Sequence, residues 1–223
     1  SIMLNETAFG EHSPHLSAPL TTLANFYRLQ KKYKQAEIVF NRILTIDSDT
    51  LGPNNPELGI TYSNIGLLYS DQERFEEAVK FYKRALEIAN ESFGQEHPST
   101  IPTMNNLAYA YSEQAKFVEA ETIFRRTLDL EERHFGSTYY LLADTLHNLG
   151  FVFVAQGLYE KALPLLRRAT EIIRHRVNIS SVGKADSWKG EQRDRQVIIE
   201  DYARLLLVLA EDNQNRAKYY RHE

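Results

Sequence analysis

The feature that most constrains this sequence is a two-residue motif, an aromatic residue or leucine followed by glycine, that returns every 42 residues. An interval held over four copies indicates a tandem array of one supersecondary unit, because a single irregular core has no reason to keep it. The four copies are Phe9-Gly10, Leu51-Gly52, Phe93-Gly94 and Phe135-Gly136.

Other positions keep the same 42-residue step. An alanine recurs three residues after an aromatic residue, and a small residue recurs directly after leucine or isoleucine. Agreement at this many positions predicts that each unit buries equivalent residues against its neighbours. The alanines are Ala36, Ala78, Ala120 and Ala162, and the small residues are Ala24, Gly66, Ala108 and Gly150.

Each unit is predicted to hold two helices, which we call helix A and helix B. Pro14, Pro56 and Pro98 precede helix A, and proline suits the first position of a helix, where its missing N–H has no intrahelical partner. After a polar break, helix B has apolar residues at i, i+3 and i+4 spacing, as over 75–88. The recurring small residues then let the two helices approach closely, to about 8–10 Å.

The residues Gly66, Tyr69, Ala78 and Tyr82 resemble the tetratricopeptide repeat, with a small residue eighth, an aromatic residue eleventh, alanine twentieth and an aromatic residue twenty-fourth. The 42-residue length and connectors such as "FGQEHPST" and "LGPNNPEL" resemble the kinesin light chain type. The resemblance covers residues 9–176, although "FGSTYYLL" in the fourth repeat lacks the His-Pro connector. It implies an all-α fold, a right-handed superhelix (α-solenoid) of helix-turn-helix repeats.

The repeats are predicted at 9–50, 51–92, 93–134 and 135–176. Residues 1–8 align with 43–50 and are interpreted as the tail of a preceding repeat helix. Residues 177–190 are expected to form an inserted loop or a helix extension. Residues 191–223 are expected to hold a capping helix, a partial fifth repeat, with Tyr202-Ala203 in the position of Leu107-Ala108.

The implied fold places helix A side chains on a concave groove that is open to a partner. The family uses such helix A asparagines to hold peptides, because an amide can pair with both the N–H and the C=O of an extended backbone. Leucine and aromatic residues beside them would contact apolar side chains. Alternatively, each asparagine bonds the backbone of a neighbouring helix. The predicted peptide-binding residues are Asn25, Ser63, Asn64, Leu67, Asn105, Asn106, Tyr109, His147, Asn148 and Phe151.

Composition and motifs argue against other classes of function. A net charge of −4 argues against nucleic-acid binding, which needs clustered cations. No apolar run is long enough to cross a bilayer, so we expect no membrane insertion. The lack of cysteine favours a cytoplasmic setting. The histidines lack metal-ligand spacing, and no nucleophile, base and orienting group occur together, so we expect no metal, cofactor or catalytic residue.

The sequence therefore predicts a non-catalytic protein–protein interaction module that binds a peptide or protein segment in its groove. Two alternatives remain open. The chain could be the recruitment or regulatory domain of a larger enzyme or signalling protein, or it could be a scaffold that self-associates through its terminal helices.

Overall fold

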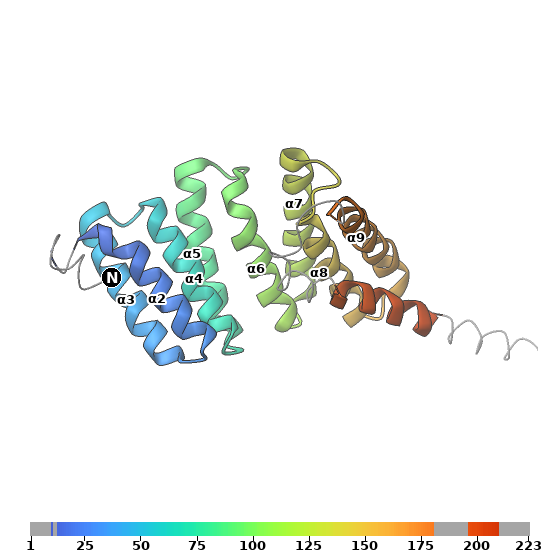
Figure 1. Cartoon of the computed structure of the whole chain (residues 1–223), viewed down its shortest axis with the longest axis horizontal. Coiled ribbons are helices and arrows are strands. Elements are labelled where there is room, and N and C mark those ends of the chain that lie inside the picture. The colour runs from blue at the N-terminus through green and yellow to red at the C-terminus, as the bar shows by residue number, and fades with distance from the viewer. Residues whose placement is uncertain (1–9, 11–12, 181–195, 210–223) are drawn as a thin grey trace, which may run out of the picture. The chain divides into compact units, whose positions relative to one another are not determined.

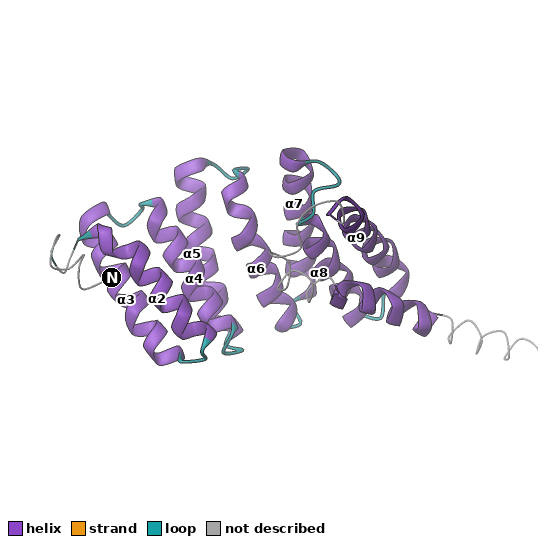
Figure 2. Cartoon of the chain, viewed as in Figure 1, coloured by secondary structure: helices purple, strands orange, loops and turns teal. Residues whose placement is uncertain are grey.

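The computed structural model describes residues 10, 13–180 and 196–209, and the chain divides into two compact units, Ser1–Ile123 and Phe124–Glu223. Every secondary-structure element in these ranges is a helix (Figures 1 and 2), which confirms the predicted all-α class. The predictions for residues 1–8 and for most of 177–190 fall outside the described residues, as do residues 191–195 and 210–223 of the predicted capping segment.

The first unit is built from pairs of helices that follow one another along the chain. α2 packs against α3 and α4 against α5, while contacts from α3 to α4 and from α5 to α6 join successive pairs. The elements are η1 (Pro14–Leu16), α2 (Ser17–Leu29), α3 (Tyr33–Leu51), α4 (Pro56–Ser70), α5 (Phe75–Phe93), η2 (Pro98–Thr100) and α6 (Ile101–Glu113), where η marks a 3₁₀-helix.

The second unit contains another such pair, α8 (Leu142–Ala155) packed on α9 (Tyr159–Ser180), and a further helix over residues 196–209. α7 (Phe117–Phe135) contains the boundary between the two units. A buried cluster joins α8, α9 and the helix over 196–209. Its residues are Leu142, Ala143 and Leu146 from α8, Ala169, Ile172 and Ile173 from α9, and Ile198 from the helix over 196–209.

Helix starts follow the prolines, with one difference from the sequence prediction. Pro56 begins α4 directly, and the side chain of Asn55 accepts a hydrogen bond from the Glu57 backbone N–H at 2.9 Å. Pro14 and Pro98 instead begin a 3₁₀ turn that leads into the α-helix. In the fourth repeat no proline is present, and α8 begins at Leu142 without a side-chain cap.

Helix B ends at the glycine of the recurring motif. Gly52 and Gly94 have φ of 86° and 87° with ψ near 160°, a backbone conformation that is essentially restricted to glycine. An added Cβ would meet no heavy atom within 4 Å at either position. The backbone, and not a lack of space, therefore explains the glycine in each connector.

Helix A approaches helix B most closely at the small residue of each pair. A Cβ on Gly66 would lie 2.6 Å from the Tyr82 ring, and a Cβ on Gly150 would lie 2.8 Å from Leu166 Cδ2. Tyr82 is fully buried and Leu166 nearly so. The prediction that small residues permit the helix contact is confirmed at these two positions.

None of the described helices has the length and apolarity together that crossing a lipid bilayer requires.

Candidate functional site

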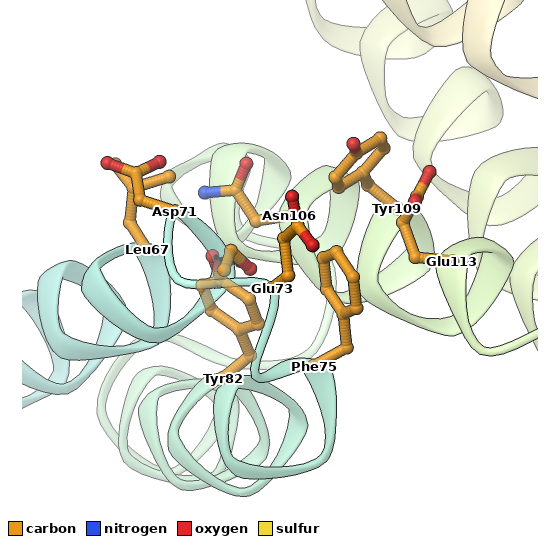
Figure 3. A pocket seen from close by; sticks show the side chains of 9 residues that line it. Leu67, Asp71, Glu73, Phe75, Tyr82, Asn106, Tyr109 and Glu113 are labelled. Carbon is orange, nitrogen blue, oxygen red and sulfur yellow. Dashed lines mark hydrogen bonds between the residues drawn. The ribbon is translucent and has the colours of Figure 1, made fainter.

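A pocket of about 510 Å³ opens in the first unit where α4, α5 and α6 meet. Figure 3 shows the side chains that line it. We call it the α4–α6 pocket. Its lining residues are Leu67 and Ser70 from α4, Asp71 and Glu73 from the linker, Phe75 and Tyr82 from α5, and Asn106, Tyr109 and Glu113 from α6.

Helical spacing brings the α6 residues to the pocket. Asn106, Tyr109 and Glu113 stand at i, i+3 and i+7, so they lie along one face of the helix. Phe75, at the first position of α5, meets the Tyr109 ring edge-on with centroids 6.3 Å apart. The pocket therefore combines the aromatic rings of Phe75 and Tyr109 with polar side chains.

The linker places a carboxylate at the pocket through an uncommon backbone conformation. Glu73 has φ of 60°, in the left-handed region that residues other than glycine adopt at an energetic cost. Its backbone N–H bonds the Ser70 carbonyl at 2.9 Å, which closes the turn from α4 to α5. The side chain of Glu73 is exposed on the pocket side of that turn.

The three carboxylates at the α4–α6 pocket differ in whether they pair with a cation. Asp71 pairs with Arg28, at 2.5 Å from Nη1 to Oδ2. Within the described residues, no lysine or arginine forms an ion pair with Glu73 or Glu113. The neighbouring Arg74 bonds Glu77 at 2.7 Å instead. In the part of the chain that the structure describes, two carboxylates therefore remain without a cationic partner at the pocket.

The tyrosines of the α4–α6 pocket respond to burial and to this charge. Burial raises the pKa of Tyr109, and the carboxylates of Glu113 and Glu73 raise it further. Burial also raises the pKa of Tyr82 to about 12, and the hydroxyl of Ser70, 3.3 Å away, only partly opposes that shift. Both hydroxyls therefore stay protonated at neutral pH.

Three of the predicted site residues, Leu67, Asn106 and Tyr109, come together in the α4–α6 pocket. Asn64, Asn106 and Asn148 lie partly exposed on helix A, and among the described residues their side-chain amides have no hydrogen-bond partner. Within the described residues, these three amides therefore do not bond a neighbouring helix. An amide of this kind can bond an incoming backbone.

Several other predicted site residues are engaged within the chain. Ser63 bonds Thr103 at 3.0 Å, Asn25 accepts a bond from Arg28 at 3.3 Å, and Asn105 also interacts with a neighbour. Asn25, Ser63, Asn64, Asn105 and Asn148 line neither this pocket nor the second one described below.

His147 and Phe151 belong to a second pocket, in the second unit. It measures about 260 Å³ and lies among α8, α9 and the helix over 196–209. We call this second pocket the α8–α9 pocket. Its His147 Nε2 is 2.8 Å from Asp201 Oδ2, so a partner would have to share or displace this contact. Its lining residues are His147, Phe151, Val154, Tyr159, Leu166, Asp201, Arg204, Leu205 and Val208.

The two pockets occupy the same position in the repeat. Four positions of the α4–α6 pocket have counterparts two 42-residue periods later in the α8–α9 pocket. Its three α6 positions have counterparts 95 residues later, with the same spacing among them. This correspondence supports the proposal that the helix over 196–209 takes the place of the next helix A. The pairs are Leu67 and Phe151, Ser70 and Val154, Phe75 and Tyr159, Tyr82 and Leu166, Asn106 and Asp201, Tyr109 and Arg204, and Glu113 and Val208.

Sequence reasoning missed the acidic members of the α4–α6 pocket. The prediction uses equivalent positions in the middle of helix A. Asp71 and Glu113 instead lie four residues after Leu67 and Tyr109, at or just past the helix end. Glu73 lies in the linker, which the repeat pattern marks only as a polar break. The spacing Leu67 to Asp71 and Tyr109 to Glu113, both i to i+4, is the signal that could have found them.

Comparison with known proteins agrees with this architecture. A family model of the tetratricopeptide repeat matches residues 15–91, 61–133 and 99–175, overlapping segments that together span more than half of the chain. The comparison with curated proteins returned no match.

Solved structures share the fold at low sequence identity. The crystal structure of BtubC (BKLC) from P. vanneervenii is 20% identical, with a TM-score of 0.68, and the match covers 93% of this chain and 82% of that chain. A second solved structure is a point variant of nearly identical TPR-like repeats, from a protein of Podosopora anserina assigned as a kinesin light chain. It is 18% identical, with a TM-score of 0.71, and the match covers 93% of both chains. A second structure of those repeats matches at 17% identity and a TM-score of 0.64, covering 86% of this chain and 96% of that one.

Proposed function

This chain belongs to the tetratricopeptide repeat family, and we propose that it is a non-catalytic module that binds an extended segment of a partner protein. The segment lies against the helix A side chains and reaches into the α4–α6 pocket. The observation that carries the proposal is Asn106, whose amide has no partner among the described residues and lines the pocket beside Tyr109.

The chemistry of these side chains suits an extended backbone. An asparagine amide offers two donors and an acceptor, so it can bond both the N–H and the C=O of one peptide unit. Tyr109 is 42% exposed in the first unit although it is a large aromatic residue. Its ring offers apolar contact to a side chain next to the bonded peptide unit. A cytoplasmic setting is part of the proposal, because the sequence has no cysteine.

A peptide selection tests this function. A random peptide library is displayed and selected on the chain, and the affinity of each selected peptide is measured for the wild type and for Asn106→Ala. We expect Asn106→Ala to weaken binding by roughly 1–3 kcal/mol, because the peptide groups that it bonded lose their partner. Thermal stability should barely change, since this amide has no partner among the described residues.

The triple variant Asn64→Ala/Asn106→Ala/Asn148→Ala extends this test to the equivalent asparagines of three repeats. Circular dichroism and thermal melting establish that the variant is folded as the wild type is. Loss of binding to the folded triple variant supports the proposal. Selected peptides that bind the wild type and the triple variant equally, or a library that yields no binding peptide, would contradict it.

Self-association is a second candidate, supported by exposed apolar residues of the helix over 196–209. Val197, Leu206, Leu207 and Val208 are apolar, and each is more than 40% exposed on that helix. A second copy that covers them would bury apolar area. Sedimentation velocity over a hundredfold concentration range tests this, with Leu207→Glu as the comparison variant. A monomer at every concentration removes the candidate.

A further inference from the structure

We propose that the α4–α6 pocket receives a lysine or arginine side chain of the bound peptide. The inference rests on the proposed function and adds the chemical class of the partner: a basic segment with an apolar residue beside the cation.

The first argument is the charge of the pocket. Asp71 is already neutralised by Arg28, whereas Glu73 and Glu113 have no lysine or arginine partner within the described residues. Their side chains lie on opposite elements, the linker before α5 and the end of α6, and line one opening (Figure 3). A cation between them would gain from both carboxylates in a partly enclosed site.

The second argument is the pair of aromatic rings that line the pocket. Tyr109 and Phe75 meet edge-on beside the same carboxylates, so the stem of a long cationic side chain can pack on the rings while its charged end reaches Glu73 or Glu113. Lysine and arginine are built this way, with an apolar stem and a charged tip, and their cations are attracted to ring faces. The described residues contain no group of three or more side chains placed to hold a metal ion, so an organic cation suits the pocket better.

The third argument is that the fold does not require these acids. The α8–α9 pocket occupies the same position of the repeat, and there Asp71, Glu73 and Glu113 correspond to Ala155, Gly157 and Val208. Lys31, Ala115 and Gly157 hold the linker position of Glu73 in the other repeats, all with positive φ. The backbone of this linker therefore does not select a carboxylate.

The test uses peptides selected from the random library on the wild-type chain. We expect selected peptides to share a lysine or arginine at one position next to an apolar residue. Binding to Glu73→Gln/Glu113→Gln should be about tenfold weaker, because the paired charges are lost while the shape of the pocket stays. Replacing the shared basic residue of the peptide by norleucine should produce a similar loss for the wild type and little further loss for the variant.

A charge-matched control separates the effect of the pocket carboxylates from the effect of the protein's net charge. Glu76→Gln/Glu91→Gln removes two exposed carboxylates from α5 that do not line the pocket, and it should leave the affinity unchanged. Raising the ionic strength should weaken wild-type binding more than binding to Glu73→Gln/Glu113→Gln.

The outcomes separate this inference from the function beneath it. Peptides that need Asn106 but carry no shared basic residue, or that bind Glu73→Gln/Glu113→Gln as tightly as the wild type, overturn the inference and leave the peptide-binding function standing. Acidic selected peptides also overturn it. A library that yields no peptide dependent on Asn106 overturns both.

Discussion

The α4–α6 pocket and the α8–α9 pocket are built on the same repeat positions but differ in chemistry. The wall of the first pocket, where helix A packs on helix B, contains Tyr82, and its edge carries the carboxylates of Asp71, Glu73 and Glu113. The second has Leu166 in the wall and is lined mainly by apolar residues, with the His147–Asp201 contact at one side. One helix-pair scaffold therefore carries two different surfaces.

The comparison teaches which positions the fold fixes and which it leaves to function. At the wall, a small residue on helix A faces a large one on helix B in both units, as Gly66 faces Tyr82 and Gly150 faces Leu166. At the edge, an acidic residue in one unit corresponds to alanine, glycine or valine in the other. Packing constrains the wall because the interior is dense, whereas edge residues can change with little cost to stability.

The largest expected difference is the response of the wall to alkaline pH. Tyr82 has a folded-state pKa of about 12, above its ordinary value of 10.0. Above pH 10 the unfolded chain releases this proton while the folded chain retains it, so stability is full below pH 10 and falls as the pH rises toward 12. The loss from Tyr82 should reach about 2–3 kcal/mol.

Urea unfolding of the wild type and of Tyr82→Phe from about pH 9 to about pH 12 measures this loss. The wild type should lose more stability than the variant, since the variant retains the ring but not the titrating hydroxyl. Phe40 and Phe124 already occupy the equivalent position in the first and third repeats, so the ring alone is compatible with the fold. Parallel pH profiles for the two proteins would show that Tyr82 is not protected from ionisation.

The next effect tests how rigid the two walls are. Gly66→Ala would bring a Cβ within 2.6 Å of the buried Tyr82 ring, and we expect it to reduce the free energy of unfolding by about 2 kcal/mol. Gly150→Ala would meet the end of the flexible Leu166 side chain instead. There the gain in helix propensity, about 1 kcal/mol, should offset most of the clash.

Urea denaturation of Gly66→Ala and Gly150→Ala at neutral pH gives both values. Equal losses for the two substitutions would contradict the distinction between an aromatic wall and an aliphatic one.

The smallest effect concerns what closes the α8–α9 pocket. Asp201→Ala removes the partner of His147, which is 2.8 Å away, and should lower the stability of the helix over 196–209 by about 1 kcal/mol. Hydrogen exchange of that helix should become faster, while exchange in α4 to α6 stays as in the wild type. Glu200→Gln, at an exposed neighbouring position of the same helix, is the control and should have a smaller effect, because glutamine keeps an acceptor for the Gln196 side chain. Unchanged exchange in Asp201→Ala would mean that apolar contacts such as Ile198 hold the helix without this bond.

Much of the fold followed from the 42-residue period. Gly66 predicted the close helix contact, and Pro56 predicted a helix start, because each depends on a local backbone or packing requirement that a residue type reveals. The 3₁₀ turns at Pro14 and Pro98 were not predicted, since the choice between 3₁₀ and α geometry in a first turn depends on capping contacts.

The site was less accessible from sequence. Asn106 and Tyr109 were found because their positions on helix A repeat, but Glu73 was not, because a linker residue carries no helical periodicity. The meeting of His147 with Asp201 joins residues across an insertion of eleven residues, which breaks the period. The interpretation of residues 191–223 as a partial fifth repeat remains a proposal, and the shared spacing of the two pockets supports it.

Photo-crosslinking tests the central claim most directly, namely that the α4–α6 pocket holds a basic side chain of a bound peptide. A selected peptide carries a diazirine amino acid beside its lysine or arginine, and mass spectrometry identifies the residues that it labels. We predict labels on residues that line the pocket, such as Tyr109, Phe75 and Leu67, and their loss in Glu73→Gln/Glu113→Gln at the same peptide concentration. Labels confined to residues outside this pocket would contradict the claim.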